Sequence, residues 1–148
     1  MSTNSTDEQG HNRNENPDKS GKGISAAIAL LGLWMIVQAL FVDIIATQFW
    51  NDIGVGALLF AVGAYNYYRR SNREAGSIAT ASVAVLLGLW LVAAPFLLGT
   101  GSGVTETTND LAFWNDIVVG LLAVALGAYS AYEAREERRE VASNRTAG

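Results

Sequence analysis

Four long apolar stretches, separated by short polar segments, dominate the pattern of hydrophobic and polar positions along the chain. The first, residues 24–42, reads ISAAIALLGLWMIVQALFV and contains no charged residue. As an α-helix rising 1.5 Å per residue it would cover roughly 28 Å, close to the bilayer's hydrocarbon core of about 30 Å. The other stretches are 50–68, 78–98 and 111–132, and their only charged residues are Asp52 and Asp116, toward the start of the first and last of these three. The pattern therefore predicts four transmembrane helices.

The four stretches form two similar halves. The pentapeptide FWNDI occurs at 49–53 and again at 113–117, an offset of 64, while GLW at 32–34 recurs at 88–90, an offset of 56. The offsets differ by eight residues, which an insertion in the loop before the second FWNDI explains, since insertions in repeats map to loops. We predict an all-α fold, a four-helix transmembrane bundle made of two tandem two-helix hairpins related by a pseudo-twofold axis along the membrane normal.

The domain organisation follows from these stretches. The predicted segments are a disordered polar N-terminal tail (1–23), repeat 1 (24–70), a cytoplasmic linker (71–77), repeat 2 (78–133) and a charged C-terminal tail (134–148). The N-terminal tail has no aliphatic or aromatic residue after Met1, too little apolar surface to order itself. A cleaved signal peptide is the alternative for the first apolar stretch, but that stretch is longer than usual for one and lacks a small-x-small site after it. We expect the C-terminal tail to extend the last helix into solvent.

Composition and charge bear on location. Of 148 residues, 50% are hydrophobic and only 16% are charged, against roughly 25% in soluble domains. All ten lysines and arginines lie in the two tails and in 69–73, while the other two loops carry only acidic residues. Because cytoplasmic loops retain positive charge, we expect a multi-pass protein of the cell membrane with both termini in the cytoplasm.

The repeated Trp-Asn-Asp is typical of a helix start in a membrane. Asn or Asp at an N-cap accepts a hydrogen bond from a free backbone N–H, the acid suits the positive end of the helix dipole, and Trp favours the headgroup level. We therefore predict caps and anchors for the second and fourth helices. The residues are Trp50, Asn51 and Asp52 in one copy and Trp114, Asn115 and Asp116 in the other. The alternative is that the two aspartates form a cation or proton site at the outer surface.

Three further positions lie inside the apolar stretches. Trp34 and Trp90 lie near the middle of theirs, too deep for an interfacial role, so we expect them to pack in the bundle, with the lining of a ligand site as the alternative. Gln38 lies one turn beyond Trp34 and is placed to bond across the bundle. Pro95 lies near the outer end of the third stretch, where a kink or an early helix end is tolerated.

With this repeat the chain resembles the SPW-repeat family of small integral membrane proteins. The family's repeat has two transmembrane helices, with Ser-Pro-Trp in the first and a Trp-Asn pair opening the second. The Trp-Asn pair is present twice, as Trp50-Asn51 and Trp114-Asn115. Of Ser-Pro-Trp only the proline of Ala94-Pro95-Phe96 is matched, and residues 38–40, Gln-Ala-Leu, match none of it. The resemblance implies a membrane location and a two-hairpin build, without an established reaction.

Candidate chemistry is sparse. The chain has no cysteine and its one histidine, His11, lies in the polar tail, so we expect no catalytic residue, no cofactor and no metal site. Without a basic patch bearing interleaved aromatics, nucleic acid is not an expected partner.

We expect a non-enzymatic structural or accessory bundle in the lipid bilayer, packed against a second copy or another membrane protein. The alternative is a small transporter or channel component that uses the acidic outer face. An enzyme has least support, because acid–base and nucleophilic chemistry need grouped reactive residues.

Overall fold

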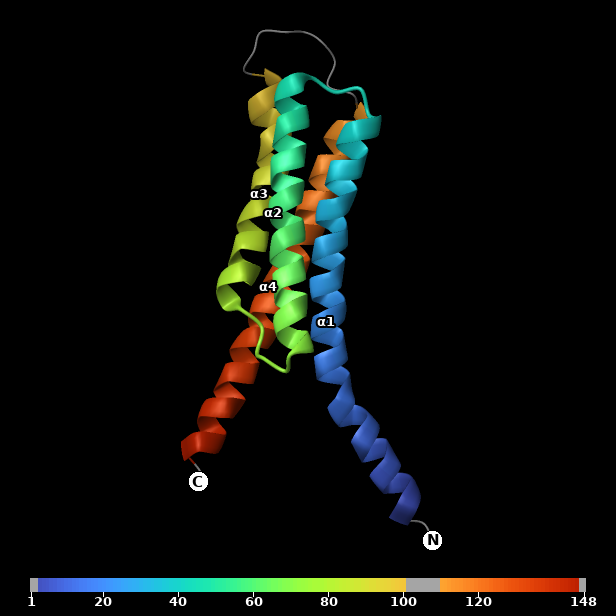
Figure 1. Cartoon of the computed structure of the whole chain (residues 1–148), viewed down its shortest axis with the longest axis vertical. Helices are drawn as coiled ribbons and strands as arrows, with labels where there is room; N and C mark the ends of the chain where they lie inside the picture. Colours follow the sequence, from blue (N-terminus) through green and yellow to red (C-terminus); the bar gives the residue numbers. More distant parts are fainter. Residues whose placement is uncertain (1–2, 101–109, 147–148) are drawn as a thin grey trace.

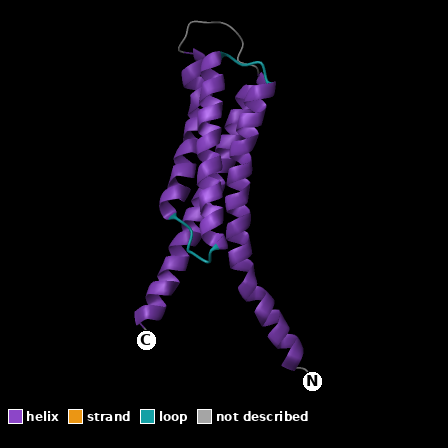
Figure 2. Ribbon diagram, viewed as in Figure 1, coloured by secondary structure: helices purple, strands orange, loops and turns teal. Residues whose placement is uncertain are grey.

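The computed structural model describes the backbone of residues 3–100 and 110–146 and the side chains of 19–98 and 110–146. Its elements are four α-helices: α1 (Thr3–Phe41), α2 (Ala46–Ser71), α3 (Ile78–Thr100) and α4 (Asp110–Thr146). No strand occurs in the described residues (Figure 2). The helices run side by side as a bundle in which α1 packs along α2 and α3 along α4 (Figure 1). The predicted all-α bundle of two hairpins is confirmed.

The bundle has two ends that differ in what they contain. We call the end at which α1 and α3 finish and α2 and α4 begin the hairpin end (Figure 1). We call the opposite end, which holds residues 72–77 and lies toward both chain termini, the terminal end. The two hairpins are therefore parallel to one another, as expected of tandem repeats in one orientation.

Glycines bring the two helices of each hairpin into close contact. A Cβ added at Gly32 would lie 2.5 Å from the carbonyl oxygen of Gly56, and one added at Gly88 would lie 2.6 Å from the carbonyl oxygen of Gly120. Because neither position has room for a side chain, the α1/α2 and α3/α4 backbones approach through small residues, the usual solution for helices in lipid. The same GLW glycine serves both repeats, at residues 32 and 88.

The middle of the bundle interior is apolar. The core cluster comprises Ile28, Met35, Val55, Leu59, Ala84, Leu91, Val119 and Ala123, two residues from each helix. In α1, α2 and α4 this layer lies between buried polar residues toward both ends, such as Asp52 and Asn66 in α2 or Asp116 and Ser130 in α4. Polar groups in the interior are thus sorted into two clusters separated by hydrocarbon.

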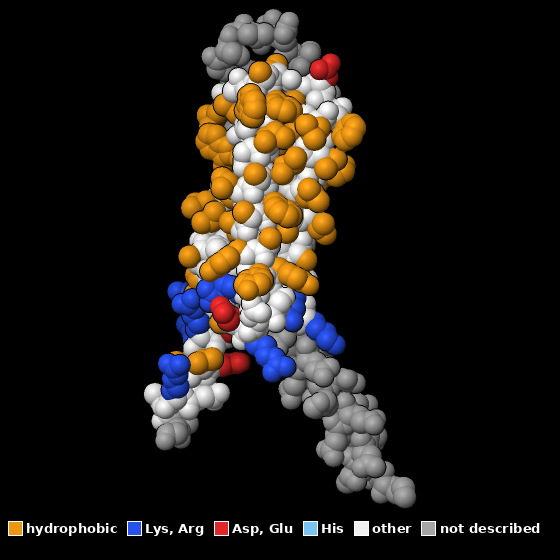
Figure 3. Space-filling model, in the orientation of Figure 1, with side chains coloured by type: hydrophobic (Ala, Val, Ile, Leu, Met, Phe, Trp, Pro, Cys, Tyr) orange, Lys and Arg blue, Asp and Glu red, His pale blue; other side chains and the backbone are white. Residues whose placement is uncertain are grey.

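The outside of the bundle suits a bilayer. Large apolar side chains cover the face shown in Figure 3, and the lysine and arginine side chains gather toward the terminal end. Helices α1, α3 and α4 contain segments long and apolar enough to cross a membrane. Helix α2 falls short of that composition because it carries polar residues, among them Gln48, Asp52, Asn66 and Arg70, all buried inside the bundle.

The helix limits differ in places from the predicted segments. Helix α1 begins at Thr3 and runs through the stretch assigned to the tail 1–23, so the disordered tail is not a separate element of the structure and its division from repeat 1 stays a prediction. Residues 72–77 join α2 to α3, one residue fewer than the predicted linker 71–77. Helix α4 continues to Thr146 with mostly exposed residues beyond Ala134, which confirms the predicted solvated extension of the last helix.

Candidate functional site

The Trp-Asn-Asp motifs lie inside helices α2 and α4, not at their caps. Helix α2 begins at Ala46 with Ile45 as its N-cap, which makes no side-chain cap hydrogen bond, so Asp52 is the seventh helical residue. Helix α4 begins at Asp110, so Asp116 is likewise the seventh. The prediction that these residues cap the helices is wrong. Both carboxylates lie about 9 Å along the helix from its first residue, nearly two turns inside.

The tryptophans of these motifs stay at the surface. Trp50 and Trp114 are exposed, and each ring meets the preceding phenylalanine edge to face, with centroids 5.4 Å apart for Phe49 and 5.7 Å apart for Phe113. The two copies therefore adopt the same local arrangement. Their role as anchors at the headgroup level stays a prediction.

Two equivalent hydrogen bonds connect the repeats, and each repeat supplies the donor of one and the acceptor of the other. Trp34 in α1 donates its Nε1–H to Asn115 Oδ1 in α4 at 2.9 Å, and Trp90 in α3 donates to Asn51 Oδ1 in α2 at 2.7 Å. The rings remain 53% and 43% exposed, so these tryptophans are not core residues. The GLW tryptophan of each repeat thus binds the Trp-Asn-Asp asparagine of the other, a pairing that the sequence analysis did not anticipate.

The two aspartates of the motifs are buried beside these bonds. Asp52 is 0% and Asp116 is 1% exposed. Gln38 in α1 donates to Asp52 Oδ2 at 3.4 Å, in the adjacent helix of the same hairpin and not across the bundle as predicted, and Asn51 Nδ2 lies 3.3 Å from Asp52 Oδ1. Gln48 in α2 donates to Asp116 Oδ2 at 3.2 Å. The outer-surface site considered from the sequence is in fact buried.

One carboxylate oxygen beside these bonds has no hydrogen-bond partner among the described residues. This oxygen is Asp116 Oδ1, which is buried. A cavity of about 10 Å³ adjoins Asp116, Gln48 and Asn51, with Ala94 and Pro95 among its apolar walls. That volume is close to the least that a single water molecule needs. Helix α3 continues through Pro95 to Thr100, so the proline does not end the helix.

The chain supplies no positive charge to this cluster. The sequence has no lysine or arginine from 23 to 68 or from 74 to 134, and the only histidine is His11. The described residues also hold no group of three or more acidic, histidine or cysteine side chains fit for a metal ion. We call the eight residues concerned the hairpin cluster: Trp34, Gln38, Gln48, Asn51, Asp52, Trp90, Asn115 and Asp116. It is acidic, its two carboxylates are buried, and it has no cation of its own.

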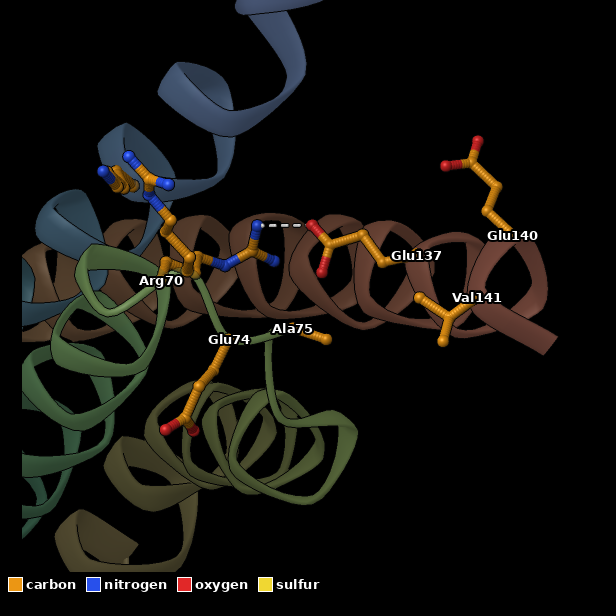
Figure 4. Close-up of a pocket in the computed structure, with 8 residues that line it drawn as sticks. Arg70, Glu74, Ala75, Glu137, Glu140 and Val141 are labelled. Carbon is orange, nitrogen blue, oxygen red and sulfur yellow. Dashed lines mark hydrogen bonds and ion pairs between the residues drawn. The ribbon is translucent and has the colours of Figure 1, made fainter. Parts of the chain in front are cut away.

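The terminal end holds a second cluster in which the charges are paired. The Arg70 side chain in α2 is 4% exposed, and its Nη1 lies 3.0 Å from Glu137 Oε1 and 3.7 Å from Glu133 Oε2 in α4 (Figure 4). Its guanidinium packs against Gly21 and Gly76, where a Cβ would collide with it. The Gly76 N–H also donates to Glu137 Oε2 at 3.0 Å. We call Arg70, Glu133 and Glu137 the terminal cluster.

A hollow of about 560 Å³ opens beside the terminal cluster. Its walls include three basic residues, Lys22, Arg70 and Arg73, and three acidic ones, Glu74, Glu137 and Glu140. The charges therefore balance, and Figure 4 shows the Arg70 guanidinium directed to Glu137. This arrangement joins α2 to α4 and does not offer a surplus charge to a ligand.

The terminal cluster was also not predicted from the sequence, although the repeat offset of 64 residues relates the positions of its acids to arginines in repeat 1. Adding 64 to Arg69 and Arg73 gives Glu133 and Glu137, so the two repeats carry opposite charges at equivalent positions. Arg70 corresponds in the same way to Ala134, which is fully buried. The opposite charges that follow Tyr68 and Tyr132 at the same offset are the sequence signal for this site.

The comparison with protein families agrees with the geometry. The family model described as SPW repeat domain matches residues 22–130 and, in a second match, 81–145. The chain belongs to the SPW repeat family. The first match spans both hairpins of this SPW repeat protein, and the family, together with the apolar helices, identifies it as a membrane protein. No curated protein and no solved structure matches the chain. Ala94 and Pro95 line the cavity next to Asp116.

Proposed function

We propose that this SPW repeat protein is a non-enzymatic structural or accessory bundle that crosses the cell membrane four times. The observation that carries the proposal is the apolar layer between the two polar clusters, represented by Met35, Leu59, Leu91 and Val119. An enzyme or a channel would bring reactive or polar groups together along a path. In the described interior the polar groups instead lie at the two ends, where most of the charged side chains have polar partners.

Helix α2 is proposed as the fourth span. Its polar residues face the interior, where Asp52 and Arg70 have partners, while Leu58, Phe60 and Tyr67 are exposed on its outer side. A helix that turns polar groups inward and apolar groups outward is suited to lipid, although its average composition is less apolar. The location of the basic residues supports termini in the cytoplasm.

Cysteine labelling tests this topology. The chain has no cysteine, so Thr105→Cys and Ser71→Cys each introduce a single thiol, in the loop after α3 and at the end of α2. In intact cells an impermeant maleimide should label Thr105→Cys alone, and Ser71→Cys should react only after permeabilisation. Labelling of Ser71→Cys but not Thr105→Cys in intact cells would reverse the proposed orientation.

A partner in the membrane is part of the proposal. Large exposed apolar side chains lie on all four helices, among them Leu30, Leu58, Leu86 and Leu121, and these surfaces can pack against a second copy or another membrane protein. Crosslinking in native membranes should capture such a complex. A strictly monomeric chain with no crosslinked neighbour would contradict an accessory role.

A small transporter or channel component is the second candidate, because the buried pair Asp52 and Asp116 lies within the spans. Proteoliposomes separate the two functions. A structural bundle should leave the vesicles as tight to protons and sodium ions as empty ones. A flux that disappears in the double variant Asp52→Asn, Asp116→Asn would establish the transporter instead.

A further inference from the structure

The hairpin cluster contains more negative charge than the bundle can neutralise. Asp52 and Asp116 are both buried, and Gln48, one turn before Asp52 on α2, is hydrogen-bonded to Asp116. Two carboxylates in one buried cluster cannot both ionise without a large increase in free energy. A neutralising positive charge must therefore come from outside the chain, because the sequence has no basic residue between 23 and 68 or between 74 and 134.

The groups around the pair do not replace that charge. Helix α1 presents the neutral Trp34 and Gln38, α2 presents Gln48 and Asn51, α3 presents Trp90 and Pro95, and α4 presents Asn115. The loops that join the helices at this end, together with the first residue of α4, add only the acids Asp43, Glu106 and Asp110. Glu106 lies outside the described residues. Every ionisable side chain that the sequence supplies to the segments between α1 and α2 and between α3 and α4 is thus an acid.

The hydrogen bonds of the cluster indicate which cation fits. Asn51 Oδ1 and Asn115 Oδ1 accept from tryptophans, both oxygens of Asp52 accept from amides, and Asp116 Oδ2 accepts from Gln48. Asp116 Oδ1 is left without a partner among the described residues, and the adjoining cavity measures about 10 Å³. Hard metal ions such as Mg²⁺ and Ca²⁺ take about six to eight oxygen ligands. A single free oxygen suits a proton.

We propose that Asp116 binds one proton at Oδ1, so that the bundle carries a neutral carboxylic acid at Asp116 and a carboxylate at Asp52. The proton comes from water at the hairpin end and adds to a lone pair of the carboxylate, and no other bond changes. The resulting O–H lies beside the cavity lined by Gln48 and Pro95. This proton site goes beyond the proposed structural role, which needs no ligand, and the apolar layer below it favours binding over conduction.

Infrared spectroscopy of the purified full chain in detergent micelles tests the proposal. At neutral pH the wild-type protein should show the carbonyl stretch of a protonated carboxyl group, and this band should disappear reversibly at alkaline pH. Asp116→Asn should lack the band. The matched control Asp110→Asn, which changes an exposed acid at the same end, should keep it.

Several outcomes would overturn the assignment. Absence of the band in the wild-type protein at neutral pH would exclude a bound proton, and a band that survives Asp116→Asn but is lost in Asp52→Asn would place the proton on the other carboxylate.

Thermal unfolding followed by circular dichroism gives a second measurement, which remains decisive if Asp116→Asn does not fold. The wild-type midpoint should fall as the pH rises, because the folded chain then loses a proton that the unfolded chain has already lost. If sodium in place of choline reverses that fall at constant ionic strength, the site binds a metal cation and the proton proposal fails.

Discussion

The hairpin cluster and the terminal cluster differ in how their polar residues are related between the repeats and in how their charges are paired. At the hairpin end the two repeats carry the same Trp, Asn and Asp at equivalent positions, so that each GLW tryptophan binds the other repeat's asparagine and both aspartates are buried. Gln38 and Gln48 are not repeated, since the equivalent positions hold Ala94 and Ala112. At the terminal end equivalent positions carry opposite charges, and the buried Arg70 binds Glu133 and Glu137. The hairpin cluster repeats its motif residues and holds no cation, whereas the terminal cluster differs between the repeats and pairs its two acids with one arginine.

The difference follows from what a twofold axis can do. Unlike residues such as Trp and Asn can exchange hydrogen bonds across the axis, since each copy supplies one donor and one acceptor. Like charges brought together across the axis repel. If repeat 2 kept the arginines of repeat 1 at 133 and 137, Arg70 would face two cations, and the change of sign at these positions makes them its ion-pair partners. In this molecule identical residues therefore indicate exchanged hydrogen bonds, and changes between the repeats indicate charge pairing.

Removing the basic partner of the terminal cluster should have the largest effect. Arg70→Met leaves Glu133 and Glu137 without their cation, and loss of one partner from a buried ion pair lowers the free energy of unfolding by about 3 kcal/mol or more. Unfolding in mixed micelles of increasing SDS content, followed by circular dichroism, measures the change. Arg73→Met, at an exposed arginine on the same hollow, is the matched control. Equal losses in the two variants would show that burial of the ion pair does not decide its contribution.

The exchanged hydrogen bonds should contribute less, and equally. Trp34→Phe and Trp90→Phe each remove one N–H donor while keeping an aromatic ring, and a single such bond contributes about 1 kcal/mol to the free energy of unfolding. The same SDS titration compares the two variants. Trp50→Phe, at an exposed ring, serves as the control and should change little. A loss confined to one of the two variants would contradict the symmetric exchange.

The sequence was sufficient to predict the fold. Four apolar stretches, the doubled FWNDI and the glycines at 32 and 88 all act locally or at a fixed repeat offset, and the structure pairs the helices as two hairpins accordingly. Helix starts were less accurate. The helix α2 begins at Ala46, because Ala-Thr-Gln is compatible with a helical turn before the motif, so Asn51 and Asp52 are carried into the second turn.

The site was harder to predict because its partners are far apart in sequence. Trp34 and Asn115 are 81 positions apart, and Arg70 and Glu137 are 67 apart. The motif residues were identified from the sequence, but their partners were not. The partner of each motif residue depends on how the two hairpins pack against one another. The burial of Asp52 also depends on that packing, so its place in the sequence beside the exposed Trp50 indicated an interface instead.

The smallest effect is expected at the neighbour of Arg70. Arg69 Nε lies 3.4 Å from Glu74 Oε2, with side chains 28% and 56% exposed, and it also donates to the Ala75 carbonyl at 3.3 Å. Exposed ion pairs contribute about 0–1 kcal/mol, so Arg69→Met should lower the free energy of unfolding by less than about 1 kcal/mol. Because Arg69 and Arg70 are adjacent on α2 and differ mainly in burial, the SDS titration of the two variants isolates that factor. A loss at Arg69 as large as that at Arg70 would mean that the terminal end is stabilised by its total positive charge, and the contrast between the two clusters would then be one of net charge alone.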